Sequence, residues 1–349
     1  MRDRPLSSRI GAAVANAEGH ARTPMKGQIT DIEGIRVGHC TDLQAITGCT
    51  VLLCEEGAVG GVDIRGSASG TRELDPLSPL HLVERIHGLL LAGGSAFGLD
   101  AAGGVMEYLE ERRVGFDMGV TRVPIVPAAI LFDLRVGDFR VRPDRTMGYR
   151  ACQAATSEVI EEGSVGAGTG ATVGKLMGIE CAMKGGLGTS SLSLQGGVAV
   201  GALVVVNAFG DVIEPESGQI LAGIRDGPEG ANLLDTAAQM RAGVFPRGYS
   251  RESTTLVAVA TNARLSKVEA SKLAQQAQLG LARTIRPVHT TLDGDAIFVM
   301  ATGRVTGDLN VLGVIAADAV AIATVRAIKK ARGLGGLPAY DDLQQRQRR

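Results

Sequence analysis

Residues 253–263 read STTLVAVATNA, a serine and two threonines followed by an almost unbroken apolar run. The β-branched valines and threonines favour an extended strand. Because polar residues do not alternate with the apolar ones, both faces of this strand are expected to be buried. Similar apolar β runs occur within residues 48–54, 191–206 and 296–302. A sheet covered on both faces is typical of layered α/β proteins, and this is the fold class that we predict.

Helices are expected to cover this sheet. The stretch 95–113 has apolar residues at helical spacing and ends in the charged run EYLEERR. The stretch 266–284 is amphipathic and begins with Ser266 as an N-cap, with Glu269 at the capping-box position. Further helices are expected at residues 228–242 and 309–332, and a further strand at residues 59–64. Residues 123–134, which contain two prolines, are expected to form a buried strand or a turn region.

The composition excludes several classes of protein. With 349 residues, 45% of them hydrophobic, the chain is too apolar for disorder and long enough for a sizeable core. Its 36 basic and 37 acidic residues leave a net charge of −1, so no basic excess exists for nucleic acid or an anionic membrane. Aromatic residues make up only 3%, which argues against stacking platforms for bases. The 48 glycines lie within apolar stretches, which favours a tightly packed α/β protein over a flexible linker.

Only one boundary is expected along the chain. Residues 1–27 form a polar, alanine-rich extension, which we interpret as disordered or as the product of a start site upstream of Met25. No linker divides residues 28–349, so a single domain is predicted there. The extension lacks the apolar stretch of a secretory signal, and the most apolar later segment contains Asp318. Five cysteines without CxxC spacing are typical of free thiols in a reducing compartment, so we expect a cytoplasmic protein.

Two glycine-rich loops lack the residues of familiar motifs. Residues 166–175 (GAGTGATVGK) have Thr169 where a phosphate-binding loop needs glycine. Residues 93–98 (GGSAFG) have Phe97 where a serine-nucleophile elbow needs its second glycine. No metal-ligand spacing occurs, so neither a metal nor a cofactor is expected. We interpret as structural the scattered histidines at positions 20, 39, 81, 87 and 289.

Polar residues at the ends of strands form a candidate site, because α/β enzymes commonly place their reactive groups there. Thr254 opens one apolar strand and Asn207 ends another. Asp293 and Asp295 flank one glycine just before a third strand, and Lys175 follows a glycine-rich loop. Each residue alone has an ordinary structural explanation: β propensity, a strand-end cap, a turn or a solvated surface charge.

Taken together and in this order, the motifs resemble the DmpA/NylC-like family of self-processing aminopeptidases and amidases. That family includes β-peptidyl aminopeptidases and nylon-oligomer hydrolases. The resemblance extends over almost the whole chain from residue 29 onward. It rests on GIRVGHCTD (34–42), VGGVDIRGSASGTRELDPL (59–77), LLLAGGSAFGLDAAGGVMEYLEER (89–112), VPIVPAAILFDL (123–134), GAGTGATVGK (166–175), KGGLGTSSL (184–192), VVVNAFGDVI (204–213), STTLVAVATNA (253–263) and IRPVHTTLDGDAIFVMATG (285–303).

The resemblance implies a fold and a maturation step. The expected fold is a four-layer αββα sandwich of the type shared with ornithine acetyltransferases. Family members cut their own chain before a serine or threonine, which here matches Thr254. A cut after Ser253 leaves an α chain of residues 1–253 and a β chain of residues 254–349. The new α-amine of Thr254, with a reference pKa of about 8, can then accept the proton of its own hydroxyl.

The resemblance also implies roles for other residues. Asn207 matches the oxyanion-hole amide, and Lys175 matches a lysine beside the nucleophile. Asp293 and Asp295 match an acidic or hydroxyl pair that hydrogen-bonds around the nucleophile. Such carboxylates raise the pKa of the α-amine, whereas a neighbouring lysine lowers it.

Two positions depart from the family pattern. Ser253 precedes the expected cut, where relatives often have asparagine. Phe132 stands where some relatives place a tyrosine near the substrate, so its side chain would contact substrate without a phenolic donor. The substrate preference of any one relative therefore does not transfer to this chain.

The expected function is hydrolysis of amide bonds in short peptides or amides with a free amino end. The expected assembly is a homo-oligomer, a tetramer of processed αβ units, without nucleic acid or membrane partners. One alternative is an acyltransferase of the ornithine-acetyltransferase type, because those enzymes also use a self-cleaved threonine. Another is a non-catalytic protein that binds an anion or nucleotide on its glycine-rich loops.

Overall fold

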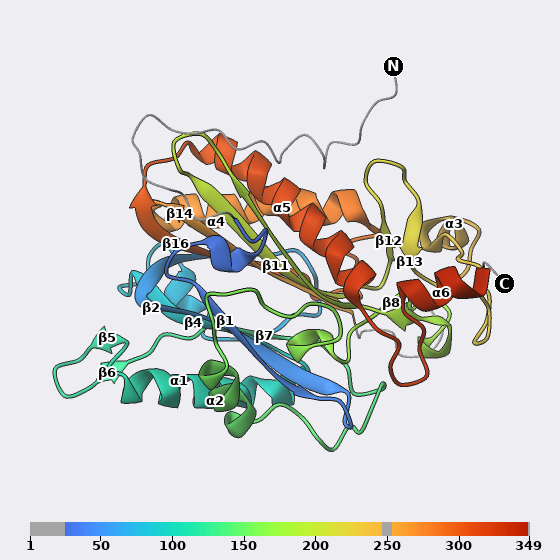
Figure 1. Cartoon of the computed structure of the whole chain (residues 1–349), viewed down its shortest axis with the longest axis horizontal. Coiled ribbons are helices and arrows are strands. Elements are labelled where there is room, and N and C mark those ends of the chain that lie inside the picture. Colours follow the sequence, from blue (N-terminus) through green and yellow to red (C-terminus); the bar gives the residue numbers. More distant parts are fainter. Residues whose placement is uncertain (1–24, 246–252, 348–349) are drawn as a thin grey trace.

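A computed structural model of the chain describes residues 25–245 and 253–347 (Figure 1). Most of the predicted extension, residues 1–24, lies outside the described residues. Within the described part, the central element is a nine-stranded sheet in the order β10-β11-β14-β16-β2-β4-β7-β3, with β1 paired to β2. Its strands are β1 (Arg36–Asp42), β2 (Thr47–Ile64), β3 (Gly70–Arg72), β4 (Arg85–Ala92), β7 (Ala128–Ile130), β10 (Gly186–Ser193), β11 (Ala199–Asn207), β14 (Thr254–Ala263) and β16 (Ala296–Val305).

Strand β2 turns the corner of this sheet. Its first half pairs with β1, its second half pairs with β16, and β4 pairs with it on both sides of an irregularity. The pairing with β4 is irregular between Leu53 and Ala58, and such irregularities bend a strand. Gly57 lies in this bend with φ +78°, a conformation that glycine adopts without steric cost. One hydrogen-bonded sheet therefore folds over into two stacked layers (Figure 1).

Three apolar cores separate four layers. On β14, Leu256 points into the core between the two sheet layers, while Val257 points into the core under α4 and α5. On β2, Leu52 points into the same middle core, while Val51 packs toward α1 and α2. Because these strands have both faces buried, their sequences lack polar alternation. The predicted αββα sandwich is thereby confirmed (Figure 1).

Helices cover the outer faces of both sheet layers. Helices α4 (Lys267–Thr284) and α5 (Leu309–Lys330) lie over one layer, and α1 (Ala101–Glu111) and α2 (Arg145–Gln153) lie over the other (Figure 1). The predicted capping box is confirmed, because Ser266 and Glu269 each accept the other's backbone N–H. The smaller elements are α3 (Thr236–Arg241), α6 (Tyr340–Gln347), β5 (Phe116–Asp117), β6 (Arg122–Val123), β8 (Thr172–Val173), β9 (Met183–Lys184), β12 (Asp211–Ile213), β13 (Ile220–Ala222) and β15 (Ile285–Arg286).

The structure differs from the strand predictions in how the segments connect. The stretch 191–206 ends in the predicted β run, β11, but Gly196 and Gly197 first turn the chain between β10 and β11 with φ +88° and +86°. Conversely, residues 48–54 and 59–64 belong to one strand, β2, whose bend resembles a loop in the sequence.

The helix predictions were too long in two places. The stretch 95–113 begins as a 3₁₀ helix at Ser95–Asp100, and only then continues as α1. Of residues 228–242, only Thr236–Arg241 is helical, because the helix begins at Asp235, whose carboxylate caps it.

Within the described residues, one helix, α5, is long and apolar enough to cross a membrane. Its most apolar stretch is 67% buried. It packs against α4 and against strands β10 and β11, which supply that burial. The position of α5 is therefore that of a core helix, and its apolar composition is explained by the protein interior.

Candidate active site

Three segments that are distant in the sequence meet at the start of β14. Thr254 pairs with Asn207, the last residue of β11. Ser253 forms a parallel bridge with Asp293, which lies just before β16. The sheet therefore brings Thr254, Asn207 and Asp293 together, as the sequence analysis predicted.

The two threonines point to opposite faces of the sheet. Thr254 shares the face of Leu256, toward the core between the two sheet layers. Thr255 shares the face of Val257, toward α4 and α5. The buried Thr255 hydroxyl has no hydrogen-bond partner among the described residues. Only Thr254 therefore presents its hydroxyl on the Asn207 and Gly294 side of the strand.

The Thr254 hydroxyl lies against the carbonyl group that precedes it. Its Oγ1 donates to the Ser253 carbonyl oxygen at 2.6 Å. The same oxygen accepts the backbone N–H of Gly294 at 2.8 Å. Ser253 and Thr254 are 1% and 3% exposed, so this arrangement is shielded from water in the uncut chain.

The side-chain amide of Asn207 has a fixed orientation. Its Oδ1 accepts the Thr172 N–H at 3.0 Å, the Thr172 hydroxyl at 3.2 Å and the Lys175 ammonium at 2.9 Å. Three donors around one oxygen turn the NH₂ group the other way, where it donates to the Phe132 carbonyl oxygen at 3.3 Å. Asn207 is fully buried and pairs directly with Thr254, so its side chain lies next to that threonine.

Lys175 is a buried cation rather than a solvated surface charge. Its Nζ donates to the Asn207 carbonyl oxygen at 2.8 Å and lies 3.3 Å from the Ser253 hydroxyl. The lysine therefore contacts both the predicted oxyanion amide and the residue before the predicted cut. Lys175 is 5% exposed, so these contacts are largely shielded from water.

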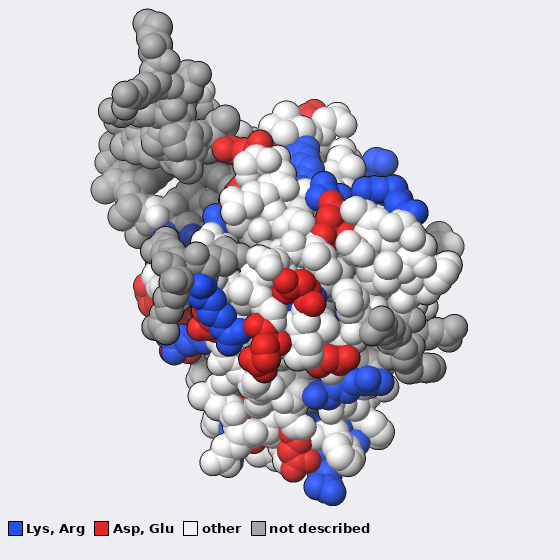
Figure 2. Space-filling view, turned by 90° about the vertical axis from the view of Figure 1, so that its right-hand side faces the viewer, with Lys and Arg blue, Asp and Glu red and all other residues white. Residues whose placement is uncertain are grey.

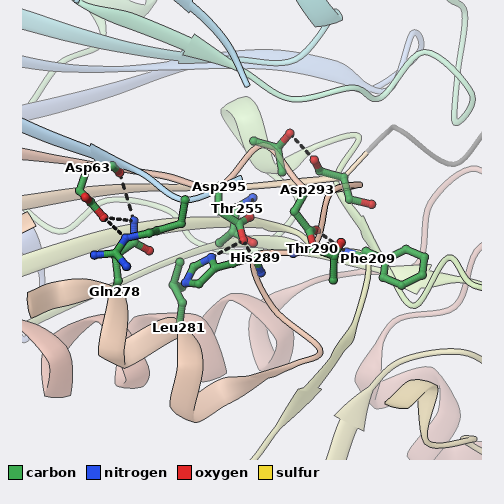
Figure 3. A network of polar contacts seen from close by, with 12 residues as sticks. Asp63, Phe209, Thr255, Gln278, Leu281, His289, Thr290, Asp293 and Asp295 are labelled. Carbon is green, nitrogen blue, oxygen red and sulfur yellow. Dashed lines mark hydrogen bonds and ion pairs between the residues drawn. The ribbon is translucent and has the colours of Figure 1, made fainter. Parts of the chain in front are cut away.

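The two carboxylates fix the segments that flank Thr254 (Figure 3). Asp293 accepts the Phe209 N–H at 3.1 Å, and the N–H and hydroxyl of Thr290 at 3.0 and 2.6 Å. Asp295 accepts the Thr255 N–H at 2.7 Å. These hydrogen bonds hold the turn before β16 and the start of β14 in place around Thr254. Burial, with the charge of Asp295, raises the pKa of Asp293 to about 6.

The structure places His289 in this network, which the sequence interpretation did not anticipate. Its ring Nδ1 lies 2.9 Å from Asp295 Oδ2, and its backbone N–H donates to the same oxygen at 3.2 Å (Figure 3). The feature of the sequence that could have linked His289 to Asp295 is its position six residues earlier in the motif HTTLDGD. Treated as one of five scattered histidines, it was assigned only a structural role.

A second buried lysine, Lys184, contacts the glycine-rich loop 166–175. Lys184, fully buried, donates to the carbonyl oxygens of Thr169 and Ala171 at 2.7 and 2.6 Å. Burial lowers the pKa of Lys184 to about 7, against the opposing effect of Asp133. Lys184 thereby holds residues 169–171 in place, and the next residue, Thr172, donates to the side chain of Asn207. Its role depends on tertiary contacts, so the sequence offered only its place in the motif KGGLGTSSL.

The family of the chain can now be stated. The model of peptidase family S58 matches residues 27–339. The chain belongs to peptidase family S58. The resemblance derived from the sequence motifs is confirmed, and membership makes the chain a hydrolase of peptide or amide bonds.

Curated S58 relatives are named as aminopeptidases and oligomer hydrolases. A protein of Mycobacterium leprae (strain TN), named an uncharacterized aminopeptidase, is 42% identical over 89% of this chain and 92% of its own length. The 6-aminohexanoate-oligomer endohydrolase of Kocuria sp. (strain KY2) is 30% identical over 86% of this chain and 85% of its own length.

Solved structures share the fold of this S58 peptidase. The L-aminopeptidase D-Ala-esterase/amidase of Ochrobactrum anthropi, described as a variant of the Ntn hydrolase fold, superposes with a TM-score of 0.70 at 19% identity. The match covers 99% of this chain and 98% of that one. A β-aminopeptidase of Burkholderia sp. gives a TM-score of 0.66 at 23% identity, with 95% and 96% covered. The fold is thus that of an N-terminal-nucleophile hydrolase.

Proposed function

We propose that this S58 peptidase cuts its own chain between Ser253 and Thr254 and then uses Thr254 as an N-terminal nucleophile. The observation that carries the proposal is the contact of the Thr254 hydroxyl with the Ser253 carbonyl group at 2.6 Å. After the cut, nucleophile and general base reside in one residue, because the freed α-amine can accept the hydroxyl proton. Asn207 then donates to the oxyanion of the tetrahedral intermediate.

The proposed substrates are short peptides or amides with a free amino end. The relatives named as aminopeptidases and as an oligomer endohydrolase support this class. Thr254 is only 3% exposed in the uncut chain, so release of the segment that ends at Ser253 would also open the nucleophile to substrate. Phe132 is proposed to line the acyl site, since its carbonyl group contacts Asn207.

A denaturing gel and an acceptor assay test this proposal. The purified protein should give fragments of 253 and 96 residues and should release free amine from short peptides. Transfer of the acyl group to added amines in preference to water would instead favour the acyltransferase alternative. A fully active enzyme that remains one intact chain would contradict the mechanism.

We also propose a homo-oligomer, a tetramer of processed αβ units. Apolar side chains are exposed on the outer faces of α4 and α5, and such patches commonly mark interfaces. They are Val268, Leu279, Val311, Val314 and Ile322. Light scattering should therefore report a particle several times heavier than 36.1 kDa. A single particle of monomer mass across a wide concentration range would refute this part of the proposal.

We propose that the enzyme acts in the cytoplasm and has no nucleic-acid partner. Figure 2 shows one face of the molecule, on which acidic and basic side chains are interspersed among uncharged ones. This face therefore presents no extended positive field for a phosphate backbone. The five free cysteines, four of them buried, support a reducing compartment.

The raised pKa of Asp293 predicts how the free energy of unfolding changes with pH. A carboxyl group whose pKa is about 6 in the folded chain favours folding while it is protonated. Its contribution is full below about pH 4, the ordinary pKa of aspartate, and is lost as the pH rises through about 6. Asp293→Asn removes this titration. As the pH rises from 4 to 7, the free energy of unfolding of the variant should therefore increase relative to that of the parent protein.

Urea unfolding at several pH values measures this difference. Both proteins should carry Thr254→Ala, so that each is expected to remain one chain and unfold in a unimolecular reaction. The mutant can be less stable throughout, since Asp293 accepts three hydrogen bonds, but the pH dependence is the readout. Parallel stability curves for the two proteins between pH 4 and 7 would show that Asp293 does not titrate in this range.

A further inference from the structure

We infer that the backbone N–H of Gly294 is the oxyanion donor of the self-cleavage reaction. The inference rests on the proposed cut between Ser253 and Thr254. It concerns the first chemical step of maturation, whereas Asn207 is the donor proposed for substrate. The self-cleavage step thus has its own stabilising group on the opposite side of β14.

The position of the donor meets the geometric requirement. An oxyanion donor must lie about 2.7–3.1 Å from the position that the charged oxygen takes in the tetrahedral intermediate, which is close to that of the carbonyl oxygen from which it forms. Gly294 donates its N–H to the Ser253 carbonyl oxygen at 2.8 Å. In the uncut chain, the amide of Asn207 donates to the Phe132 carbonyl oxygen at 3.3 Å. The hydrogen bond from Gly294 therefore already lies on the oxygen of the scissile peptide.

The Thr254 hydroxyl lies so close to Gly294 that no space is left for a side chain at this position. A Cβ atom at this position would lie 2.9 Å from Thr254 Oγ1 and 2.6 Å from the Ala68 carbonyl oxygen. Both distances are shorter than real Cβ contacts, so any larger residue would displace the nucleophile or the facing loop. The backbone of Gly294 thus approaches both the hydroxyl and the carbonyl group that react.

The turn that carries Gly294 is held from several sides. The Asp293 carbonyl oxygen accepts the Ala68 N–H at 2.9 Å, and the Asp293 N–H donates to the Thr290 carbonyl oxygen at 3.1 Å. The Asp293 side chain is anchored to Phe209 and Thr290 (Figure 3). A donor fixed in this way needs no reorganisation when charge develops, which is the source of its stabilising effect. Asp293 therefore acts on self-cleavage as a positioning residue for the Gly294 amide.

The chemical step is an N-to-O acyl shift followed by hydrolysis. Thr254 Oγ1 forms a bond to the Ser253 carbonyl carbon, and the carbonyl oxygen becomes an oxyanion that Gly294 N–H stabilises. The bond from that carbon to the Thr254 nitrogen then breaks, and the hydroxyl proton ends on the departing amine. Water hydrolyses the resulting ester to give the Ser253 carboxylate and the free Thr254 hydroxyl. No other reactant is needed.

An amide-to-ester exchange tests this inference without adding atoms. Glycolic acid in place of Gly294, introduced by nonsense suppression during cell-free synthesis, replaces the N–H by an oxygen. The matched control is lactic acid in place of Ala68, which removes another N–H hydrogen bond of the same turn, the one to the Asp293 carbonyl oxygen. Mass spectrometry identifies the 96-residue fragment and distinguishes it from chemical hydrolysis of the new ester at residue 294.

We expect the Gly294 ester to slow self-cleavage by about 10²–10³-fold relative to the Ala68 ester, as for loss of one oxyanion donor. Equal cleavage rates in the two esters would overturn the inference. So would a Gly294 ester that loses its resistance to limited proteolysis while the Ala68 ester keeps it, because the hydrogen bond would then be structural. An unaltered chain that never cuts would contradict the proposed function itself.

Discussion

Thr254→Ala should yield a single uncut chain of 349 residues without hydrolase activity. The substitution removes the only hydroxyl that the structure places against the Ser253 carbonyl group, at 2.6 Å within the described residues. Without that nucleophile the acyl shift cannot begin, so neither the cut nor the new α-amine forms. A denaturing gel, combined with an assay of amine release from a short peptide, measures both losses at once.

Two neighbouring variants serve as controls. Thr255→Ala should still cut and retain activity, because Thr255 lies on the opposite face and its hydroxyl has no partner among the described residues. Thr254→Ser keeps a hydroxyl and should retain some processing. Edman sequencing of the small wild-type fragment should read Thr-Thr-Leu-Val. A Thr254→Ala protein that is cut at residue 254, or a Thr255→Ala protein that is not, would refute the assignment.

Asn207→Ala should leave the chain cut but lower kcat by about 10²–10³-fold, the effect of removing one oxyanion donor. The variant also deprives Thr172 and Lys175 of an acceptor, so a stability loss of about 1–3 kcal/mol is expected. The alternative, a strand-end asparagine with only a structural role, predicts the stability loss without the loss of turnover. Steady-state kinetics of the processed variant, with thermal unfolding, separate these outcomes.

Asn262→Ala is the matched control for this substitution. Asn262 also lies on a central strand, β14, and makes two side-chain hydrogen bonds, with Ala199 and Gly197 at 2.8 Å each. It lies near the opposite end of that strand from Thr254. Its loss should therefore lower stability but leave kcat unchanged. Near-normal turnover in a processed Asn207→Ala protein would remove Asn207 from the site.

The elements that the sequence predicted best are those specified by local chemistry. The capping box at Ser266 and the apolar strand after Thr254 depend on residues within a few positions of each other. The opposite orientation of Thr254 and Thr255 followed from the two-residue period of a strand. These local rules, with the family motifs, predicted that Thr254, Asn207 and Asp293 come together.

The remaining features depend on tertiary contacts that no local pattern encodes. Lys175 and Lys184 are buried because backbone carbonyl groups from other segments surround their ammonium groups. The role of His289 depends on a turn that brings its ring to Asp295. The corner in β2 likewise resembled a loop between two strands, because its exposed Glu55 and Glu56 interrupt the apolar pattern.

The positions of β14 and β16 have a consequence for how the mature enzyme unfolds. The two strands are adjacent in the centre of the sheet, with β11 on one side and β2 on the other. After the proposed cut they belong to the small chain, while both flanking strands belong to the large one. Neither chain keeps a closed core alone, so refolding would require the two chains to associate and would depend on their concentration. In the precursor, by contrast, all strands of the sheet belong to one chain. The lifetime of the mature protein would therefore be set by its unfolding rate.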